Sequence, residues 1–223
     1  MFRYSEKKWN AQLQNMGILR IGTLHDFRRS EHRNGIADSQ EGKKRVTHAI
    51  KHLEMPAMLD HEARQSMDAR SIEAFGAIKL GPGVSAKLTN LRFTRQFNHP
   101  DVYVLCTSWQ KSKATMSSLE GADSCLEITD PVGFYNAITE SLSDVCPVKF
   151  LGIRKVQYGS KEEEWNGNNW GHHPVYLKEA AYSPQCEVRA VWHPQRPGPI
   201  SPVVIGHSKL PKLCRWLPLT DIP

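Results

Sequence analysis

The sequence lacks the features that define several large classes of protein. No part of its 223 residues approaches the run of about 18 apolar residues that a transmembrane helix needs, so we predict no membrane-spanning segment. The first ten residues, MFRYSEKKWN, carry charge but no apolar core of a secretory signal. Hydrophobic residues still make up 39% of the chain, which is enough for a folded core and excludes disorder over its whole length.

Motifs for the common cofactor and metal sites are also missing. GxGxxG, GxxxxGKS/T and HExxH do not occur, which removes the two usual nucleotide-phosphate loops and the helical zinc site. The cysteines are odd in number, widely spaced and without a CxxC pair: Cys106, Cys125, Cys146, Cys186 and Cys214. We therefore expect no metal site and no disulfide framework, and we expect a cytoplasmic protein with ordinary buried thiols.

Positive charge is in moderate excess, formally +6. This excess permits a nucleic acid or another anionic partner. Trp165 and Trp170 lie in a polar loop rich in Asn, Gly and His, from which they could stack on unpaired bases. The basic residues that could contact phosphates are Lys43, Lys44, Arg45, Lys51, Arg92 and Arg95. The alternative is that these charges form only a solvated face.

The N-terminal segment predicts a strand, a helix and a second strand. Residues 2–4 form the first strand, and Ser5 is placed to cap the helix. Trp9, Leu13 and Met16 then form one apolar stripe, and Gly17 ends the helix. Residues 18–21 form the second strand.

The rest of the chain predicts mainly strands. Residues 102–109 read VYVLCTSW, a nearly continuous apolar run that is typical of a central strand. Further strands are expected at 124–129, 149–158 and 186–192, with short irregular strands in the proline-rich tail. Asp130-Pro131 begins a helix with its cap and first residue in the favoured order. Residues 43–100 are basic and partly helical in pattern. The pattern predicts a single α+β domain over 1–223, with 43–100 as an insertion.

Three polar groups lie on or beside predicted strands. Arg3 and Tyr4 belong to the first strand, Thr107 and Ser108 end the central strand, and Glu187 and Arg189 share one face of a late strand. A charge inside an apolar strand is costly if it is buried without a partner. These charges therefore lie either on a solvated face or in a cleft with a function.

The segment from Thr23 to Glu41 is dense in charge of both signs. Loops of this kind after a strand often carry function. In a functional loop, Arg28 would contact a phosphate and Glu31 would act as a base. The alternative is a solvated loop whose charges pair with one another.

The order of Arg3, Ser108 and Glu187 resembles the Arg–Ser–Glu arrangement of the ADP-ribosyltransferase superfamily. The segments FRYS and MGILRIGTL resemble the opening strand, helix and strand of that superfamily. Within it, the chain is similar to small bacterial toxins that modify nucleic acid, the DarT-like enzymes and mRNA-modifying toxins of anti-phage toxin–antitoxin systems. It also resembles a family of uncharacterised bacterial defence-associated domains, over most of the chain outside 43–100. Two departures are that Cys106-Thr107-Ser108 replaces Ser-Thr-Ser and that Arg189 replaces the second acid of Glu-x-Glu.

The resemblance implies an ADP-ribosyltransferase-like split mixed sheet with flanking helices and NAD as a substrate. Glu187 would stabilise the positively charged sugar formed when the nicotinamide bond breaks. Ser108 would orient the substrate or that carboxylate, and Arg3 would bind a phosphate or ribose of NAD. Tyr4 would stack on nicotinamide. Arg28 and Glu31 complete the predicted catalytic set, and Thr23 completes the predicted cofactor-binding set.

The resemblance also implies partners. RNA is favoured over DNA as the acceptor, and an antitoxin and a chaperone are expected. Three alternatives stay open: an ADP-ribosyltransferase acting on protein, a metal-independent nuclease using His25, Glu31 and His48, and a non-catalytic binding module of a defence operon.

Overall fold

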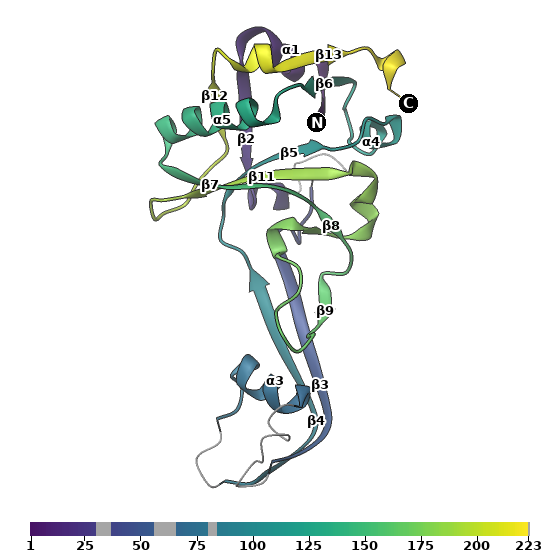
Figure 1. Ribbon diagram of the computed structural model, residues 1–223, viewed down its shortest axis with the longest axis vertical. Coiled ribbons are helices and arrows are strands. Elements are labelled where there is room, and N and C mark those ends of the chain that lie inside the picture. The colour runs from purple at the N-terminus through teal and green to yellow at the C-terminus, as the bar shows by residue number, and fades with distance from the viewer. Residues whose placement is uncertain (30–36, 56–65, 80–83, 223) are drawn as a thin grey trace. The chain divides into compact units, whose positions relative to one another are not determined.

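The computed structural model describes residues 1–29, 37–55, 66–79 and 84–222 (Figure 1). Helices and strands are mixed along the chain, which confirms the predicted α+β class. None of the described helices is long and apolar enough to cross a membrane. The strands are β1 (Phe2–Ser5), β2 (Ile18–Thr23), β3 (Lys43–Met55), β4 (Ala86–Asn98), β5 (Tyr103–Ser108), β6 (Ser124–Ile128), β7 (Val148–Lys155), β8 (Gln157–Tyr158), β9 (Glu162–Glu164), β10 (Leu177–Lys178), β11 (Glu187–Pro194), β12 (Val203–Gly206) and β13 (Cys214–Leu217). The helices are α1 (Lys7–Met16), α3 (Met67–Phe75), α4 (Lys113–Ser117) and α5 (Pro131–Val145), with 3-10 turns η1 (Asp26–Arg28), η2 (Pro174–Tyr176), η3 (Ala180–Gln185), η4 (Leu210–Leu213) and η5 (Leu219–Asp221).

The chain divides into two compact units. The first contains Met1–Gly42, His99–Gly159 and Val175–Pro223, and the second contains Lys43–Asn98 and Ser160–Pro174. The segment 43–100, expected as an insertion, thus makes up most of the second unit. We expected residues 159–173 to be a surface loop, but all of them except Gly159 belong to the second unit as well.

The first unit is built on a sheet with strands in the order β12-β2-β5-β1-β6-β13, with β11 between β5 and β7 (Figure 1). Its described strand pairs are all antiparallel, so the mixed sheet that the resemblance implied is wrong on this point. Strand β5 pairs with three others, so the prediction of a central strand is confirmed. Helix α5 covers one face with Phe134, Ala137 and Ile138, all buried in the main core. Its start is as predicted, because Asp130 Oδ1 accepts a hydrogen bond from Gly133 N (3.0 Å) and Pro131 follows.

This sheet splits along one edge of β5. Tyr103 and Val104 pair with β2, and Ser108 pairs with Phe2 of β1. Between these points, Leu105 to Thr107 have no strand partner on that edge among the described residues. Strands β2 and β1 therefore pair with opposite ends of the same edge of β5, and the sheet is open between them.

Helix α1 connects the two sides of this opening, and its buried face differs from the predicted one. Gly17 ends the helix with φ +67°, and its N–H donates to Leu13 O (3.0 Å), as expected for a glycine cap. However, Trp9 and Met16 are 45% and 64% exposed, so the predicted apolar stripe is wrong. The buried positions are Leu13 and the polar residue Asn10. The asparagine is tolerated there because its amide finds hydrogen-bond partners.

The second unit is an antiparallel ribbon of β3 and β4, extended by the short parallel strand β9. The ribbon runs in register from the pair Lys43–Asn98 to the pair Met55–Ala86. Helix α3 packs on one face, where Ile50, Ile72 and Phe93 form a core of their own. Strand rather than helix therefore dominates the described part of the segment that we predicted to be partly helical.

Candidate functional site

Three side chains from distant parts of the sequence form one row across the sheet. Ser108 of β5 pairs directly with Phe2 of β1 on one side and with Glu187 of β11 on the other. Directly opposed residues of antiparallel strands point to the same face. Cys106 and Arg189, each two residues further along, share that face because side chains alternate along a strand.

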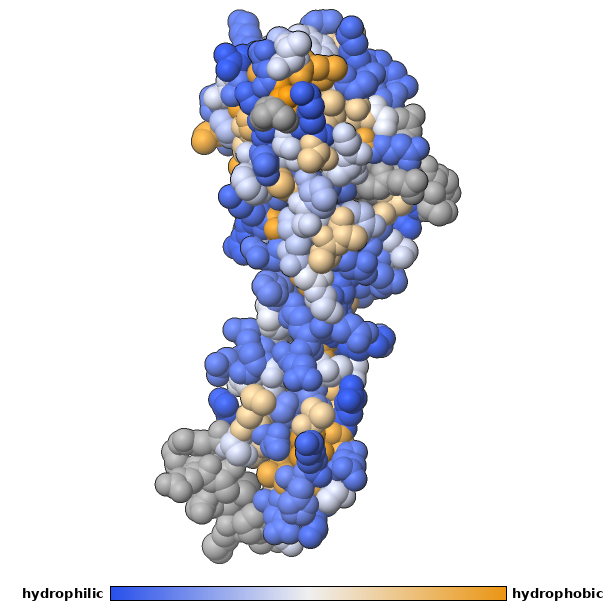
Figure 2. All heavy atoms as spheres, turned by 90° about the vertical axis from the view of Figure 1, so that its right-hand side faces the viewer, coloured by the Kyte–Doolittle hydropathy of each residue, from blue (hydrophilic) through white to orange (hydrophobic). Residues whose placement is uncertain are grey.

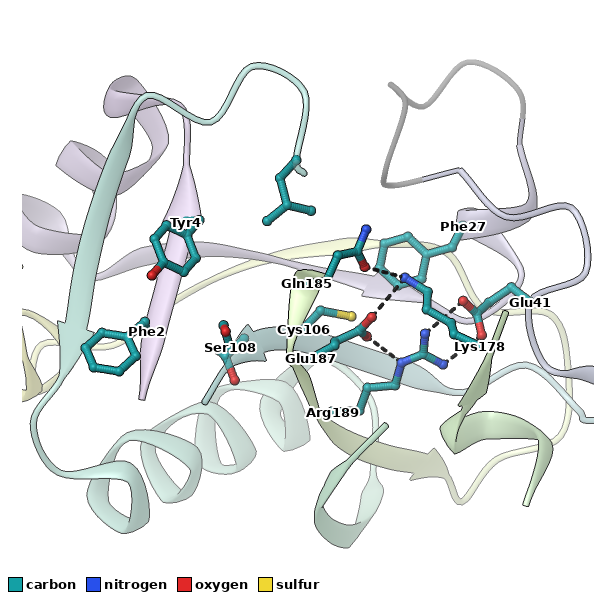
Figure 3. A pocket seen from close by; sticks show the side chains of 12 residues that line it. Phe2, Tyr4, Phe27, Glu41, Cys106, Ser108, Lys178, Gln185, Glu187 and Arg189 are labelled. Carbon is teal, nitrogen blue, oxygen red and sulfur yellow. Dashed lines mark hydrogen bonds and ion pairs between the residues drawn. The ribbon is translucent and has the colours of Figure 1, made fainter. Parts of the chain in front are cut away.

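This face forms the floor of a small cavity of about 80 Å³ (Figure 3). Figure 3 shows the acidic and basic side chains gathered at one side, with Ser108 and two aromatic rings at the other. The residues that line the cavity are Phe2, Tyr4, Phe27, Glu41, Cys106, Thr107, Ser108, Leu119, Lys178, Gln185, Glu187 and Arg189. Glu187 is 3% exposed, so it belongs to a cleft rather than to a solvated face.

The charged groups in this cavity form a closed network. Arg189 Nε lies 2.5 Å from Glu187 Oε1, and its two terminal nitrogens bind Glu41 Oε1 and Oε2 at 2.7 and 2.9 Å. Lys178 Nζ lies 2.8 Å from Glu187 Oε2 and donates to Gln185 Oε1 at 2.9 Å. Two carboxylates face two cations, so the formal charge of the network is zero. Such balance is the condition under which buried charges are tolerated.

The network keeps Glu187 ionised. Burial by itself would raise the pKa of this carboxyl, but the charges of Arg189 and Lys178 outweigh burial and hold the pKa well below its usual range. Burial would lower the pKa of Lys178, but Glu187 outweighs that effect and raises it. Glu187 Oε2 lies 2.8 Å from Lys178 Nζ, so each oxygen of this carboxylate contacts a cation. A carboxylate oxygen has more than one acceptor position, so a further donor group could also bind here.

This depressed pKa predicts acid sensitivity. A glutamate in the unfolded chain titrates near pH 4.3, whereas folded Glu187 stays ionised at lower pH. Its stabilising contribution is therefore complete above about pH 4.3 and is lost as the pH falls toward the folded pKa, at up to about 1.4 kcal/mol per pH unit. Urea unfolding at a series of pH values from 7 to 3 measures this slope. Glu187→Gln should unfold with a shallower acid slope, and an unchanged slope would contradict the assignment.

A larger cavity of about 530 Å³ adjoins the first one at the split in the sheet. The two cavities share Tyr4, Phe27, Cys106 and Leu119. A volume in this range is typical of sites for small ligands and cofactors. The other lining residues come from β1, α1, β2, β5, β12 and the segment before β6: Arg3, Ser5, Glu6, Trp9, Gln12, Ile18, Leu19, Arg20, Gly22, Val104, Leu105, Glu120, Gly121, Ala122 and Val204.

Arg3 lines this larger cavity. It lies between Phe2 and Tyr4 on β1, so its side chain points to the opposite face of the strand. The structure thus brings Ser108 and Glu187 together but places Arg3 in the adjoining cavity, not in the single cleft that we expected. Burial lowers the pKa of Arg3 to about 10, and no described carboxylate lies within 4 Å of its guanidinium.

The other predicted site residues have different positions. The Tyr4 ring lines both cavities, while its hydroxyl donates to Gln110 O (3.0 Å). Thr23 is buried, and its Oγ1 accepts a hydrogen bond from Asp26 N (3.2 Å), so it stabilises a turn. Arg28 Nε donates to the carbonyl of Glu41 (2.7 Å). Neither Thr23 nor Arg28 lines a cavity described above, and Glu31 lies outside the described residues.

Arg28 therefore contacts the backbone of Glu41, whose side chain lines the small cavity, and not the cavity itself. The sequence marked Glu41 only as one acid of a charged segment, and Lys178 gave no signal at all. Gly42 was the one local hint, because its φ of +67° is a conformation that favours glycine and its N–H donates to Glu41 Oε1 (3.1 Å).

Two of the residues predicted to bind nucleic acid are instead part of the core of the second unit. Lys44 is buried, and its ammonium pairs with Glu163 Oε2 at 2.9 Å. Trp165 is 5% exposed and packs edge-on against Phe75. The prediction that Trp165 stacks on bases is therefore wrong, because its ring is enclosed by apolar and aromatic neighbours. Trp170 is half-buried, with the Arg95 guanidinium 4.5 Å from its ring centre.

The two histidines predicted for a nuclease belong to different units, and the third residue of that set, Glu31, lies outside the described residues. His25 belongs to the first unit, where its Nε2 donates to the carbonyl of His99 (2.8 Å). His48 belongs to the second unit, where it is buried and its Nε2 donates to Asp68 Oδ1 (2.7 Å). Both rings thus have local structural partners.

All five cysteines lie in the described part of the chain and are free thiols, buried or half-buried. Burial raises the pKa of Cys106 well above its usual value, with Glu187 as the next contribution. Its thiol is therefore protonated and unreactive at neutral pH.

Comparison of the chain with protein-family models, with curated proteins and with solved structures found no match.

Proposed function

We propose that the protein is a mono-ADP-ribosyltransferase that takes NAD as its substrate. The observation that carries this proposal is the row of Phe2, Ser108 and Glu187 beside a split in the sheet, with the buried carboxylate of Glu187 lining a cavity. The resemblance of the sequence to ADP-ribosyltransferases rests on the same strands. Two adjoining cavities of about 80 and 530 Å³, which share four lining residues, offer room for a dinucleotide.

In this proposal, each of the two cavities binds a different part of NAD. The small cavity, with Glu187, Ser108 and the Tyr4 ring, would hold the nicotinamide riboside half. Arg3 in the large cavity would bind the diphosphate, since its guanidinium has no acidic partner and a planar donor fork suits phosphate. Because both halves meet at the residues that the cavities share, one extended ligand could occupy both.

Glu187 and Ser108 would orient the ribose. NAD supplies an activated ribose, whose bond to nicotinamide breaks with the electron pair leaving on nicotinamide. Beside its contact with Lys178, Glu187 Oε2 would accept a hydrogen bond from a ribose hydroxyl. Arg189 and Lys178 offset much of its charge, so its main work is in positioning the sugar, with a smaller part in stabilising positive charge. Ser108 Oγ, which donates to Cys186 O (3.2 Å), would keep the start of β11 in place.

A nucleic acid, with RNA favoured, is the acceptor in this proposal. Support comes from the positive net charge of the chain and from one face of the β3–β4 ribbon. Arg45, Lys51 and Arg92 are exposed there, on the side away from buried Ile50. Arg45 pairs with Glu162 at 2.9 Å, so Lys51 and Arg92 are the stronger phosphate contacts. Figure 2 shows a mainly hydrophilic surface on the visible side of this unit. An antitoxin and a chaperone remain predictions from the resemblance alone.

Labelled NAD tests the proposal. The purified protein is incubated with NAD labelled in its adenylate phosphate and with RNA, single-stranded DNA or cell lysate. We expect release of nicotinamide and label in RNA that ribonuclease, but not protease, removes. Label that only protease removes would identify a protein acceptor instead. RNA cut without NAD would identify a nuclease, and NAD neither bound nor consumed would favour a binding module and reject the proposal.

A further inference from the structure

We infer that Asn10 is a positioning residue that holds the Arg3 guanidinium in the wall of the large cavity as a receptor for a phosphate group. The inference deepens the proposed function, on which it rests only for the identity of the ligand as NAD. The contact between the buried amide of Asn10 and the Arg3 guanidinium, which has no acidic partner, does not depend on the proposed function.

Asn10 is fully buried and makes hydrogen bonds on both sides of its amide. Its Oδ1 accepts from Arg3 Nη1, and its Nδ2 donates to Ser124 Oγ at 2.9 Å. Ser124 Oγ in turn donates to the carbonyl of Ser5 at 2.7 Å. These bonds tie the Asn10 amide of α1 to Ser124 of β6. The fixed amide in turn holds the Arg3 guanidinium of β1 in one orientation.

The local charges leave Arg3 ready for an anion. Arg20 also lines the cavity, but it pairs with Asp26 at 2.7 Å. Glu6 pairs with Lys8 at 2.9 Å, and neither Glu6 nor Glu120 lies within 4 Å of the Arg3 guanidinium. A protein that needed Arg3 only for stability would gain from an acid at position 10, because a buried cation is costly without a counter-charge.

An amide at position 10 instead orients the guanidinium without neutralising it. The negative charge that pairs with Arg3 would then come from the ligand. A phosphate suits this site because charge-assisted hydrogen bonds to guanidinium are strong and directional.

Asn10→Asp separates this role from a purely structural one. The new carboxylate would pair with Arg3 and compete with the ligand. We expect the affinity for ADP, measured by titration calorimetry at fixed low salt, to fall by about tenfold or more. The melting temperature should change little, because the new ion pair with Arg3 is offset by loss of the amide's hydrogen bond to Ser124 Oγ. Asn15→Asp is the matched control, because it makes the same change at an exposed position of α1 and should alter neither quantity.

Each outcome decides the inference. Unchanged ADP affinity in Asn10→Asp, or no ADP binding by the unmodified protein, would overturn it. If Asn10→Asp does not fold, Ser124→Ala decides, because loss of the bond that fixes the amide must weaken ADP binding relative to Asn15→Asp.

Turnover separates this inference from the proposed function. With NAD as substrate, Asn10→Asp should raise KM and leave kcat near its original value. ADP binding that depends on Asn10 in a protein that never consumes NAD would support the inference and reject the proposed function. NAD consumption with unaltered ADP binding in Asn10→Asp would support the proposed function and reject the inference.

Discussion

Replacement of Arg189 by methionine is expected to lower the free energy of unfolding by about 3–5 kcal/mol, which is typical when one partner of a buried ion pair is removed. Arg189 is 1% exposed and lies between Glu187 and Glu41, with short contacts to both. Without it, two buried carboxylates share the cavity with the single cation Lys178. One of them must then take up a proton or the site must open.

Urea unfolding at pH 7 measures this loss. Arg215→Met is the matched control, since Arg215 also contacts a glutamate, Glu127, at 2.6 Å but is 67% exposed. An exposed pair contributes at most about 1 kcal/mol, so the control should be nearly neutral. Adding Glu41→Gln to Arg189→Met should restore part of the stability, because it removes the carboxylate left without a partner. Equal losses in Arg189→Met and Arg215→Met would mean that the network is not buried as described.

Replacement of Glu187 by glutamine is expected to reduce NAD-dependent transfer by about 10²-fold, the usual effect of misplacing a reacting group. Glutamine keeps the shape and one oxygen but loses the charge and one acceptor. The affinity for ADP should change little, because Arg3, which would hold the phosphates, lines the other cavity.

Initial rates of nicotinamide release measure the effect, together with the melting temperature of each variant. Glu127→Gln, at a glutamate on β6 outside both cavities, is the control. A folded Glu187→Gln protein with full activity would remove Glu187 from the reaction and leave it as a structural partner of Arg189. Activity lost only in proportion to the fraction unfolded would lead to the same conclusion.

Local signals in the sequence predicted most of the regular structure. The apolar run around Val104 and Leu105 placed the central strand, because a strand buried on both faces needs apolar residues throughout. Asp130 and Pro131 located the start of α5, and Gly17 located the end of α1, because caps depend on residues adjacent in sequence. These features need no knowledge of the rest of the chain.

The apolar stripe of α1 shows where local pattern fails. Trp9 and Met16 fit the helical period, yet they lie at the surface, while Asn10 is buried. Periodicity reports which residues can share a face of a helix, but only the neighbouring elements determine which face is covered. Here Arg3 and Ser124 make the burial of an amide favourable.

The candidate site was predictable only in part. The pairing of Ser108 with Glu187 follows from two strands that the sequence indicated, and it places two predicted residues in one cavity. The partnership of Arg189 with Glu41 joins residues 148 positions apart, and no local pattern reports it. The same is true of Lys178, which reaches Glu187 from a two-residue strand.

By itself, the sequence determined the α+β class, the central strand and a short set of polar residues placed on strands, because these depend on side-chain period and on caps within a few residues. Tertiary structure alone decided that Glu187 lies in a neutral network of charges, that Arg3 faces a separate cavity, and that Trp165 is a core residue. Burial and charge pairing are properties of the space around a side chain, and that space is assembled from segments far apart in the chain.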